Sequence, residues 1–207
     1  MNVTIEWQSE PARRVRANDV ELAYWDTGEG VPVLTLHGFP TSRRVWRHQL
    51  ALWAQAGYRV VAPDLPGFGQ SERPLELAAY RIERVGAALL ALLDSLDITK
   101  CHLVGHDWGA ALTWWLSTSC PERVLRHVSL SVGHPAYLRA PSLEQRRRLW
   151  YALLFQFDGL AEAALISRDW ALFREHVGGH AESAHWLADL ARPGALTAAL
   201  NWYRANL

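Results

Sequence analysis

A tight turn between two glycines constrains the fold of this chain more than any other feature of its sequence. The apolar run Lys100–Gly105 leads into Gly-His-Asp-Trp-Gly, and a helical pattern follows at once over Trp108–Ser119. Glycine on both sides lets a strand and a helix approach where a side chain would not fit. This spacing is that of a nucleophile elbow with Asp107 at its tip, although on the pentapeptide alone an aspartate that caps an ordinary turn is an equally good interpretation.

Strand-like and helix-like segments alternate along the first part of the chain. Short apolar runs typical of strands are separated by stretches in which apolar residues recur at helical spacing. The expected strands are Ala12–Arg16, Val20–Trp25, Val31–Leu36, Tyr58–Ala62, Lys100–Gly105 and His127–Val132, and the expected helices are residues 41–56, 82–96 and 108–119. The first two strands flank a turn signal and suggest a hairpin. The remainder predicts an α/β fold with a mostly parallel sheet and helices on both faces.

The pattern changes after Pro135. Only helical segments follow, at about residues 142–157, 160–177, 181–190 and 196–207. The sequence therefore divides into a core over residues 1–134 and a helical cap over residues 135–207. A length of 207 residues suits one sizeable core rather than two domains.

Charge and composition argue against several functional classes. The chain has 21 Lys and Arg residues against 21 Asp and Glu residues, which gives no support for binding to nucleic acid or to a membrane surface. No apolar run approaches membrane-spanning length, and the first residues lack the order of a signal peptide. The two cysteines and the histidines show no metal-ligand spacing. We expect a cytoplasmic protein without a metal or a cofactor.

A second motif changes the interpretation of the elbow. His37-Gly38-Phe39-Pro40 follows the expected strand Val31–Leu36 directly. In the α/β-hydrolase fold this loop supplies one backbone N–H of an oxyanion hole, which here belongs to Phe39. The other N–H belongs to Trp108, at the N-terminus of a helix. Two motifs in the right order, each at a strand end, favour a functional role for Asp107.

The stretch of residues 37–74, followed by LVGHDWGAALTWWLS and CPERV, resembles the α/β-hydrolase superfamily, and within it the epoxide hydrolases. The resemblance covers about residues 20–207 and implies an α/β-hydrolase core with a helical cap. Epoxide hydrolases carry aspartate at the elbow. A carboxylate is ionised at pH 7 and displaces a leaving group at saturated carbon without a base. Water then attacks the ester at the enzyme's own carbonyl carbon, where the oxyanion hole acts.

Two tyrosines of the cap indicate which leaving group is involved. Tyr151 in WYALLFQ and Tyr203 in LNWYR stand in contexts that resemble the two cap segments of epoxide hydrolases in which a tyrosine hydrogen-bonds the epoxide oxygen. Phenols can donate both a hydrogen bond and a proton to the alkoxide. A lone tyrosine would be interpreted as packing, but two in matching contexts favour function. The aromatic residues Trp46, Phe68 and Phe155 are expected to bind an apolar substrate.

The resulting hypothesis is an enzyme that opens a small apolar epoxide to a vicinal diol through an ester on Asp107. A haloalkane dehalogenase is the runner-up, because it also suits an aspartate nucleophile. Trp108 could hold a halide, but Phe39 stands where dehalogenases often have an asparagine donor. A non-catalytic binding module, or a degenerate fragment that keeps the pocket, is a third hypothesis.

The resemblance further implies an acid and a base after the cap, because the triad of this fold runs nucleophile, acid, base along the chain. No strand-like run follows the cap before Leu207, so we expect a core truncated after its cap that lacks the usual catalytic histidine and acid. The strand His127–Val132 would then have an open edge, which predicts self-association. Among the other histidines, His37 is expected to brace its loop, His106 to pack in the elbow, and His134 not to be the base.

Overall fold

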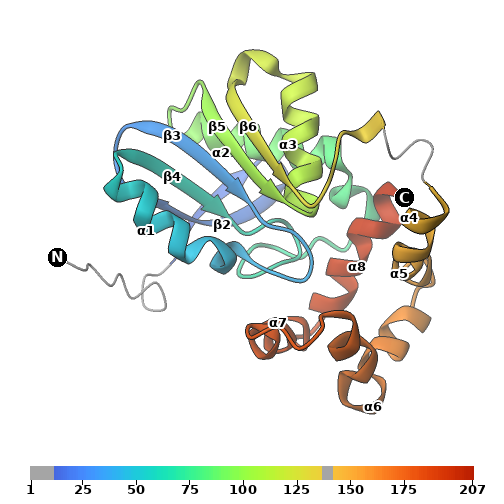
Figure 1. The fold of residues 1–207 in the computed structure, drawn as a ribbon. Coiled ribbons are helices and arrows are strands. Elements are labelled where there is room, and N and C mark those ends of the chain that lie inside the picture. The colour runs from blue at the N-terminus through green and yellow to red at the C-terminus, as the bar shows by residue number, and fades with distance from the viewer. Residues whose placement is uncertain (1–11, 137–141) are drawn as a thin grey trace.

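The computed structural model of the protein describes residues 12–136 and 142–207 (Figure 1). Its six strands form a single sheet in the order β1-β2-β4-β3-β5-β6. The strands are β1 Arg13–Ala17, β2 Val20–Thr27, β3 Val31–Leu36, β4 Tyr58–Pro63, β5 Cys101–His106 and β6 Val124–Leu130. β2 runs antiparallel to β1 and β4, while β4, β3, β5 and β6 are parallel to one another. The predicted α/β class, with an antiparallel hairpin at the N-terminal side, is therefore confirmed.

Three helices cover the two faces of the sheet (Figure 1). The helices are α1 Arg47–Gln55, α2 Ile82–Ser95 and α3 Trp108–Ser119. Short 3-10 turns lie before α1 (η1 Arg43–Trp46), before α2 (η2 Leu77–Tyr80) and after α3 (η3 Pro121–Arg123). Successive side chains of a strand point to opposite faces, so Val60 and Ala62 of β4 pack under α1 while Val61 packs in the larger core on the α2 and α3 side. That larger core continues without a break into the cap.

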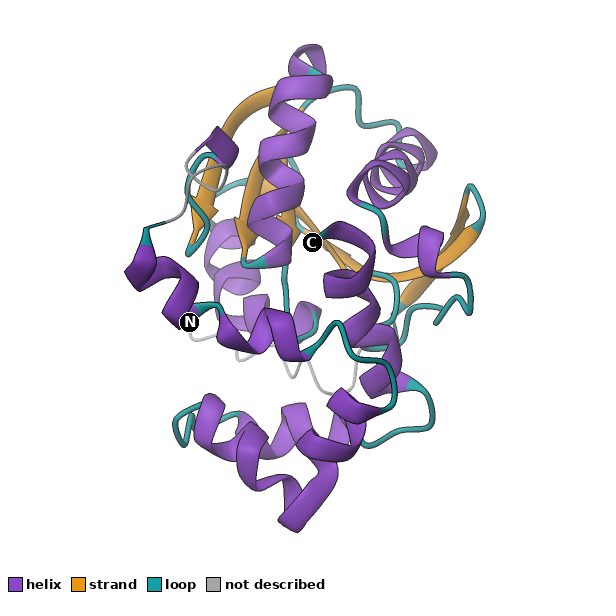
Figure 2. Ribbon diagram, turned by 90° about the vertical axis from the view of Figure 1, so that its right-hand side faces the viewer, coloured by secondary structure: helices purple, strands orange, loops and turns teal. Residues whose placement is uncertain are grey.

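The cap consists of helices only within residues 142–207. They are α4 Leu143–Arg148, α5 Trp150–Leu154, α6 Leu160–His176, α7 Ser183–Leu190 and α8 Ala195–Asn206. Figure 2 shows them lying beyond one end of the sheet. A capping box between Ser142 and Gln145 begins the first of them.

Four segments differ clearly from the predicted ones. The helix expected over residues 41–56 is the 3-10 turn η1 followed by α1, which begins at Arg47. β6 begins at Val124 rather than at His127, because its register against β5 starts at the pair of Cys101 and Val124. The single helix expected over residues 142–157 is two helices, separated at Leu149. α6 is interrupted at residues 167–170, where three successive residues have a positive φ. This interruption contains neither glycine nor proline, so the sequence carries no local signal for it.

Helix α8 fastens the cap to the core. The side chain of Trp202 is fully buried, and its Nε1 donates to the Pro66 carbonyl at 2.9 Å. Asn206 accepts from the Ile82 backbone N–H at 3.0 Å and donates to the Tyr80 carbonyl at 2.9 Å. The bond from the Ile82 N–H to Asn206 satisfies a group at the start of α2 that has no partner inside its own helix. The last described helix thus caps a helix of the core.

β6 forms one edge of the described sheet. Leu125, Val128 and Leu130 are 45%, 50% and 44% exposed on it. An edge strand with apolar side chains is a template for pairing with another chain. Self-association through this edge stays a prediction. None of the described helices is long and apolar enough to cross a membrane.

Replacing Trp202 by alanine should destabilise the protein by about 3–5 kcal/mol, since it leaves a cavity and an unpaired carbonyl at Pro66. Urea unfolding followed by circular dichroism measures the change. Trp150, on α5, is 48% exposed and is the matched control. Its replacement by alanine should cost less than about 1 kcal/mol. Equal losses for the two variants would show that α8 does not fasten the cap.

Candidate active site

The backbone at Asp107 has the geometry of the elbow that the sequence predicts. Asp107 has φ 54° and ψ −121°, a conformation that is strained for any residue with a side chain. Its N–H donates to the Leu130 carbonyl at 3.2 Å. A Cβ added to Gly105 would overlap the Gly109 carbonyl, and one added to Gly109 would overlap the carbonyl of Leu36. Both glycines are therefore required by the close approach of β3, β5 and α3.

Two backbone N–H groups face the Asp107 carboxylate. The Phe39 N–H donates to Oδ1 at 2.8 Å, and the Trp108 N–H also stabilises the charged form. A Cβ on Gly38 would overlap Oδ1 and lie 2.6 Å from the Trp108 nitrogen. Burial raises the pKa of Asp107 above its ordinary value, while these two N–H groups oppose the rise. The loop after β3 and the N-terminus of α3 thus form one anion-stabilising site.

His37 braces the loop that carries the Phe39 N–H. Its Nε2 accepts from the Leu65 backbone N–H at 2.9 Å, and its Nδ1 lies 3.1 Å from the Gly38 carbonyl. This pattern requires a neutral ring with its proton on Nδ1. The side chain is fully buried, and burial lowers the pKa of His37 to about 3. The ring therefore stays neutral and structural, in the role expected of it.

A buried ion pair supports the same loop from the other side. Asp64, at the end of β4, accepts from the backbone N–H of Arg43 at 2.8 Å and from its guanidinium. The Gln70 N–H is a third donor, at 2.8 Å. The guanidinium of Arg43 lies over the ring of Trp25, 4.7 Å from its centroid. Asp64 thus joins the loops after β3 and β4.

The two cap tyrosines lie close to Asp107. The rings of Tyr151 and Tyr203 are 5.9 Å apart, and the ring of Tyr203 is 5.1 Å from that of Trp108 and 5.7 Å from that of Phe39. Burial raises the pKa of both phenols, and the charge of Asp107 raises it further. Both phenols therefore stay protonated at neutral pH and can donate hydrogen bonds.

The three aromatic residues expected at the substrate site occupy different places. Phe155 lies among the tyrosines, with its ring 4.9 Å from that of Tyr203. Phe68 packs behind the loop, 5.2 Å from the ring of His37. Trp46 belongs to the small core between α1 and the sheet. Of the three, Phe155 alone is in ring contact with a cap tyrosine.

Two residues lie beside the site where the sequence did not predict them. The fully buried ring of Phe173 is 6.4 Å from that of Phe39. The His176 ring is 4.6 Å from that of Tyr151, and burial lowers the pKa of His176. Both residues lie on α6 beyond its interruption, so helical periodicity did not place them near the site.

Neither a metal cluster nor a hydrogen-bonded histidine base is found in the described part of the chain. No group of three or more His, Cys, Asp or Glu side chains there could hold a metal ion. Within those residues no histidine forms a hydrogen bond with the Asp107 carboxylate. His134 instead packs against Trp114, with ring centroids 4.8 Å apart.

Because His37 is neutral in the folded protein, we expect the free energy of unfolding to fall in acid. Its pKa is about 3 in the folded protein against an ordinary value of 6.5. Between these values the unfolded chain binds a proton that the folded chain does not, so stability falls as the pH drops from 6.5 toward 3. The contribution lost between pH 7 and pH 5 should be about 2 kcal/mol.

Urea unfolding at several pH values measures this slope. The His37→Gln variant should lose the part of this pH dependence that comes from His37. His48 is exposed, and the His48→Gln variant should keep it. A folded His37→Gln variant that kept the full wild-type slope would contradict the role of His37.

Comparison with known proteins agrees with the geometry. A family model described as alpha/beta hydrolase fold matches residues 31–190. Epoxide hydrolase A of Mycobacterium tuberculosis is 41% identical over 176 residues, which cover 81% of this chain and 54% of that protein. AB hydrolase superfamily protein YfhM of Bacillus subtilis is 32% identical over 204 residues, which cover 92% of this chain and 71% of that protein.

Solved structures are similar along most of the chain. Epoxide hydrolase VrEH1 from Vigna radiata superposes with a TM-score of 0.80 at 32% identity, covering 93% of this chain and 70% of its own. The Bacillus megaterium epoxide hydrolase in complex with an inhibitor gives a TM-score of 0.83 at 26% identity, with coverages of 93% and 71%. The chain thus spans between 54% and 71% of the length of these relatives. The protein belongs to the α/β-hydrolase family, in its epoxide hydrolase branch.

Proposed function

We propose that this chain opens an epoxide through a covalent ester on Asp107. The observation that carries the proposal is the position of two phenols, the partly buried Tyr151 and the buried Tyr203, near a carboxylate that two backbone N–H groups stabilise. One carboxylate oxygen attacks a ring carbon of the epoxide and the carbon–oxygen bond of the ring breaks. Its electron pair stays on the departing oxygen, which receives a proton from a tyrosine.

The tyrosines favour an epoxide over an alkyl halide. An epoxide leaves as an alkoxide that needs a proton, whereas a halide leaves as a stable anion. The two phenols keep their protons at neutral pH because burial and the charge of Asp107 raise their pKa values. The aromatic rings of Phe39, Phe155 and Phe173 beside them suit a small apolar substrate. The names of the curated relatives, among them epoxide hydrolases, support the same class.

The second half-reaction is the hydrolysis of the ester. Water attacks the carbonyl carbon of Asp107, the N–H groups of Phe39 and Trp108 stabilise the oxyanion, and the diol leaves. This step needs an activated water. No histidine within residues 12–136 and 142–207 is hydrogen-bonded to Asp107, so we propose that the ester accumulates on the 207-residue chain. Neither half-reaction uses a metal or an organic cofactor.

Incubation of the 207-residue chain with styrene oxide should therefore add one substrate mass per chain, and the adduct should persist for hours. Intact-mass spectrometry measures the adduct, and peptide mapping should place it on Asp107. The Asp107→Asn variant is the control and should lack the adduct at early times. With 1-chlorobutane the adduct should form more slowly.

Three results would count against the proposed function. A folded chain that forms no adduct would favour the non-catalytic binding module. Faster reaction with 1-chlorobutane would favour a dehalogenase. An adduct that clears within minutes would show that another group of this chain activates water.

The rate of alkylation should fall as the pH is lowered through the raised pKa of Asp107, because only the carboxylate attacks.

Tyr151→Phe and Tyr203→Phe should each slow alkylation at neutral pH by roughly tenfold or more, since each removes a proton donor. The half-exposed Tyr58, at the start of β4, provides the control Tyr58→Phe, which should leave the rate unchanged. Rates are taken from the growth of the adduct mass. An unchanged rate of alkylation in the double variant Tyr151→Phe and Tyr203→Phe would show that neither tyrosine takes part in the reaction.

A further inference from the structure

An ion pair inside the cap joins the helix that carries Tyr203 to α6. Arg204, the next residue on α8, donates from two guanidinium nitrogens to the two carboxylate oxygens of Glu162, each at 2.9 Å. The side chains of Arg204 and Glu162 are only 8% and 14% exposed. A two-point bond of this kind fixes the orientation of both partners as well as their distance. Arg204 therefore holds α8 in a defined position against the first turn of α6.

The same guanidinium also reaches the end of the helix that carries Tyr151. Its Nε donates to the Phe155 carbonyl at 2.9 Å. That carbonyl lies just past the last residue of α5, where carbonyl groups have no partner inside their own helix. In the opposite direction, Nε2 of Gln156 donates to the Tyr203 carbonyl at 3.2 Å. One side chain from each segment thus bonds to the backbone of the other.

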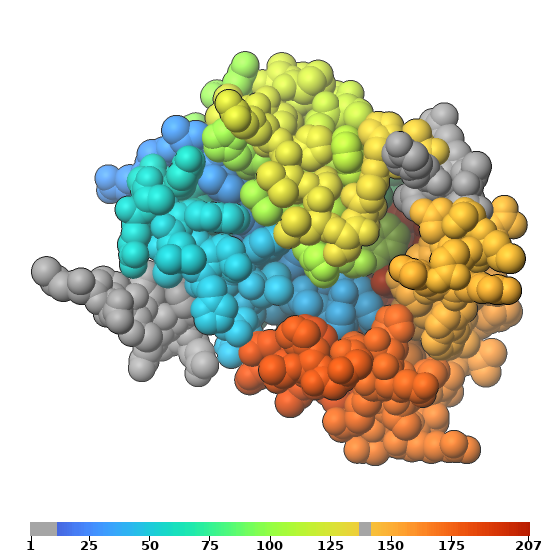
Figure 3. Space-filling view, in the orientation of Figure 1, coloured from blue at the N-terminus to red at the C-terminus, as the bar shows by residue number. Residues whose placement is uncertain are grey.

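These bonds lie next to the rings of the candidate active site. Phe155 follows Tyr151 by one helical turn, and its N–H donates to the Tyr151 carbonyl at 2.9 Å. The ring of Phe155 lies 5.5 Å from that of Tyr151 and 4.9 Å from that of Tyr203. In Figure 3 little of the red α8 is visible, between the core and the amber α4 and α5. A shift of α8 relative to α5 would change the separation of the two phenols.

The ion pair is charged at neutral pH. Burial raises the pKa of Glu162, but the hydrogen bonds and the charge of Arg204 outweigh burial and hold that pKa below its ordinary value. The exposed Asp158 forms a second ion pair with Arg204 at 3.3 Å. A buried cation that loses its partner is strongly unfavourable. The guanidinium therefore stays on Glu162 and keeps its bond to the Phe155 carbonyl.

From these observations we propose that Arg204, oriented by Glu162, is a positioning residue for the tyrosine pair. It holds α8 against the end of α5 at a distance that lets both phenols donate to the same epoxide oxygen. Loss of its bonds lets the phenols move apart, and a displacement of about 1 Å in a reacting group can cost about a hundredfold in rate. The inference rests on the proposed function, because the phenols are the groups that Arg204 positions.

Replacement of Arg204 by methionine tests this role. Arg204→Met keeps an unbranched side chain but removes every donor. It should slow alkylation by saturating styrene oxide by about tenfold, because the proton donors are displaced. The epoxide concentration that gives half of the maximal rate should stay the same, since the aromatic rings that contact the substrate remain. Growth of the adduct in intact-mass spectra measures both quantities.

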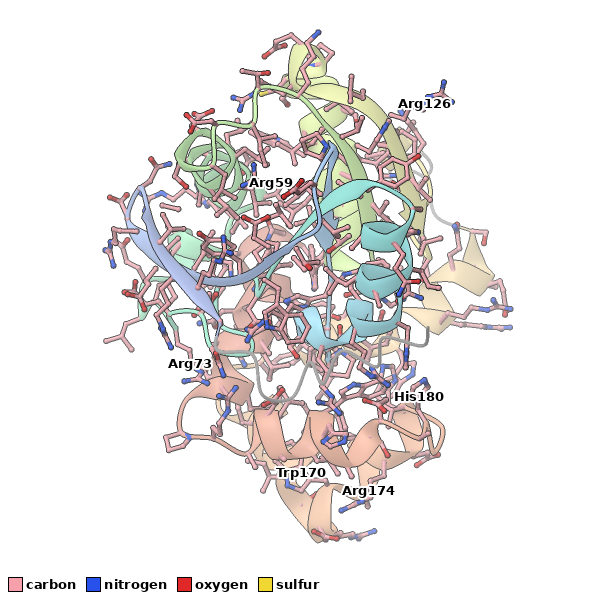
Figure 4. All side chains as sticks on the ribbon, turned by 90° about the vertical axis from the view of Figure 1, so that its left-hand side faces the viewer. Arg59, Arg73, Arg126, Trp170, Arg174 and His180 are labelled. Atoms are coloured by element: carbon pink, nitrogen blue, oxygen red, sulfur yellow. The ribbon has the colours of Figure 1, made fainter. Side chains whose placement is uncertain are left out.

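Arg174→Met is the matched control. Arg174, on α6, also donates to a carbonyl at 3.0 Å and to a carboxylate at 3.3 Å, both of Asp169. Figure 4 shows Arg174 at the end of the cap away from the sheet. Its replacement should leave the rate of alkylation unchanged, and circular dichroism verifies that the variants are folded.

A second variant covers the case in which Arg204→Met does not fold. Glu162→Gln keeps the volume of the side chain but removes the charge that orients the guanidinium. It should slow alkylation by at least about threefold, as expected for the weakening of one hydrogen-bonded charge pair. A folded Arg204→Met or Glu162→Gln variant that reacts at the wild-type rate would overturn the proposal.

A purely structural role for Arg204 predicts a different result once the phenols are removed. In the double variant Tyr151→Phe and Tyr203→Phe no proton donor is left to position. Adding Arg204→Met to it should therefore change the remaining rate by less than about twofold. A further tenfold loss would overturn the proposal, since Arg204 would then support the site as a whole.

A measurement without substrate separates this inference from the proposed function. In a chain labelled with 3-fluorotyrosine, Tyr151→Phe and Tyr203→Phe identify the fluorine NMR signals of the two phenols. Arg204→Met should shift both signals, whereas Arg174→Met should shift neither. Unshifted signals in folded Arg204→Met would overturn the positioning role even where Asp107 is alkylated. A wild-type chain that forms no adduct would instead count against the proposed function, and the fluorine signals would still show whether Arg204 sets the position of the phenols.

Discussion

The close approach of three backbone segments around Asp107 is the constraint on which the rest of the structure depends. The end of β3, the end of β5 and the start of α3 meet where Gly38, Gly105 and Gly109 leave no room for a side chain. This contact holds Asp107 in a strained conformation and aims two N–H groups at its carboxylate. Strain of this kind persists only where the surroundings over-determine it. Here the surroundings are the parallel strands, the neutral His37 brace and the buried pair of Asp64 and Arg43.

The same constraint explains why the cap lies where it does. Asp107 is at the carboxyl end of a parallel strand, which is where open α/β sheets bind ligands. α8 packs against this end through Trp202 and brings Tyr203 next to Trp108. Tyr151 reaches the site because its ring and that of Phe155 pack on Tyr203. Packing of aromatic rings thus positions both tyrosines.

The sequence predicted those parts of the site that have local causes. The glycines on either side of Asp107 indicate a close approach of two backbone segments, and His37-Gly38-Phe39-Pro40 indicates a loop at the end of a strand. The two tyrosines came from resemblance alone, because nothing local indicates that α5 and α8 touch. Residue type predicted that Trp46 and Phe68 bind an apolar substrate, but it could not show on which side of the sheet or of the loop each of them packs. The interruption of α6 contains neither glycine nor proline, so no local sequence pattern predicts it.

The contact between α8 and the start of α2 has a consequence for how the chain acquires its structure. Asn206 completes the hydrogen bonding of Ile82 across more than half of the sequence. Trp202 belongs to the larger core, whose other members include Val61 of β4 and Leu89 of α2. Contacts between residues so far apart in the sequence stabilise the fold only after the long intervening chain has been closed into a loop. The entropy cost of that closure slows folding. During synthesis, α8 can pack on the larger core only after residues 195–206 have been made. Until then the apolar face beneath α8 is exposed to chaperones and to neighbouring nascent chains.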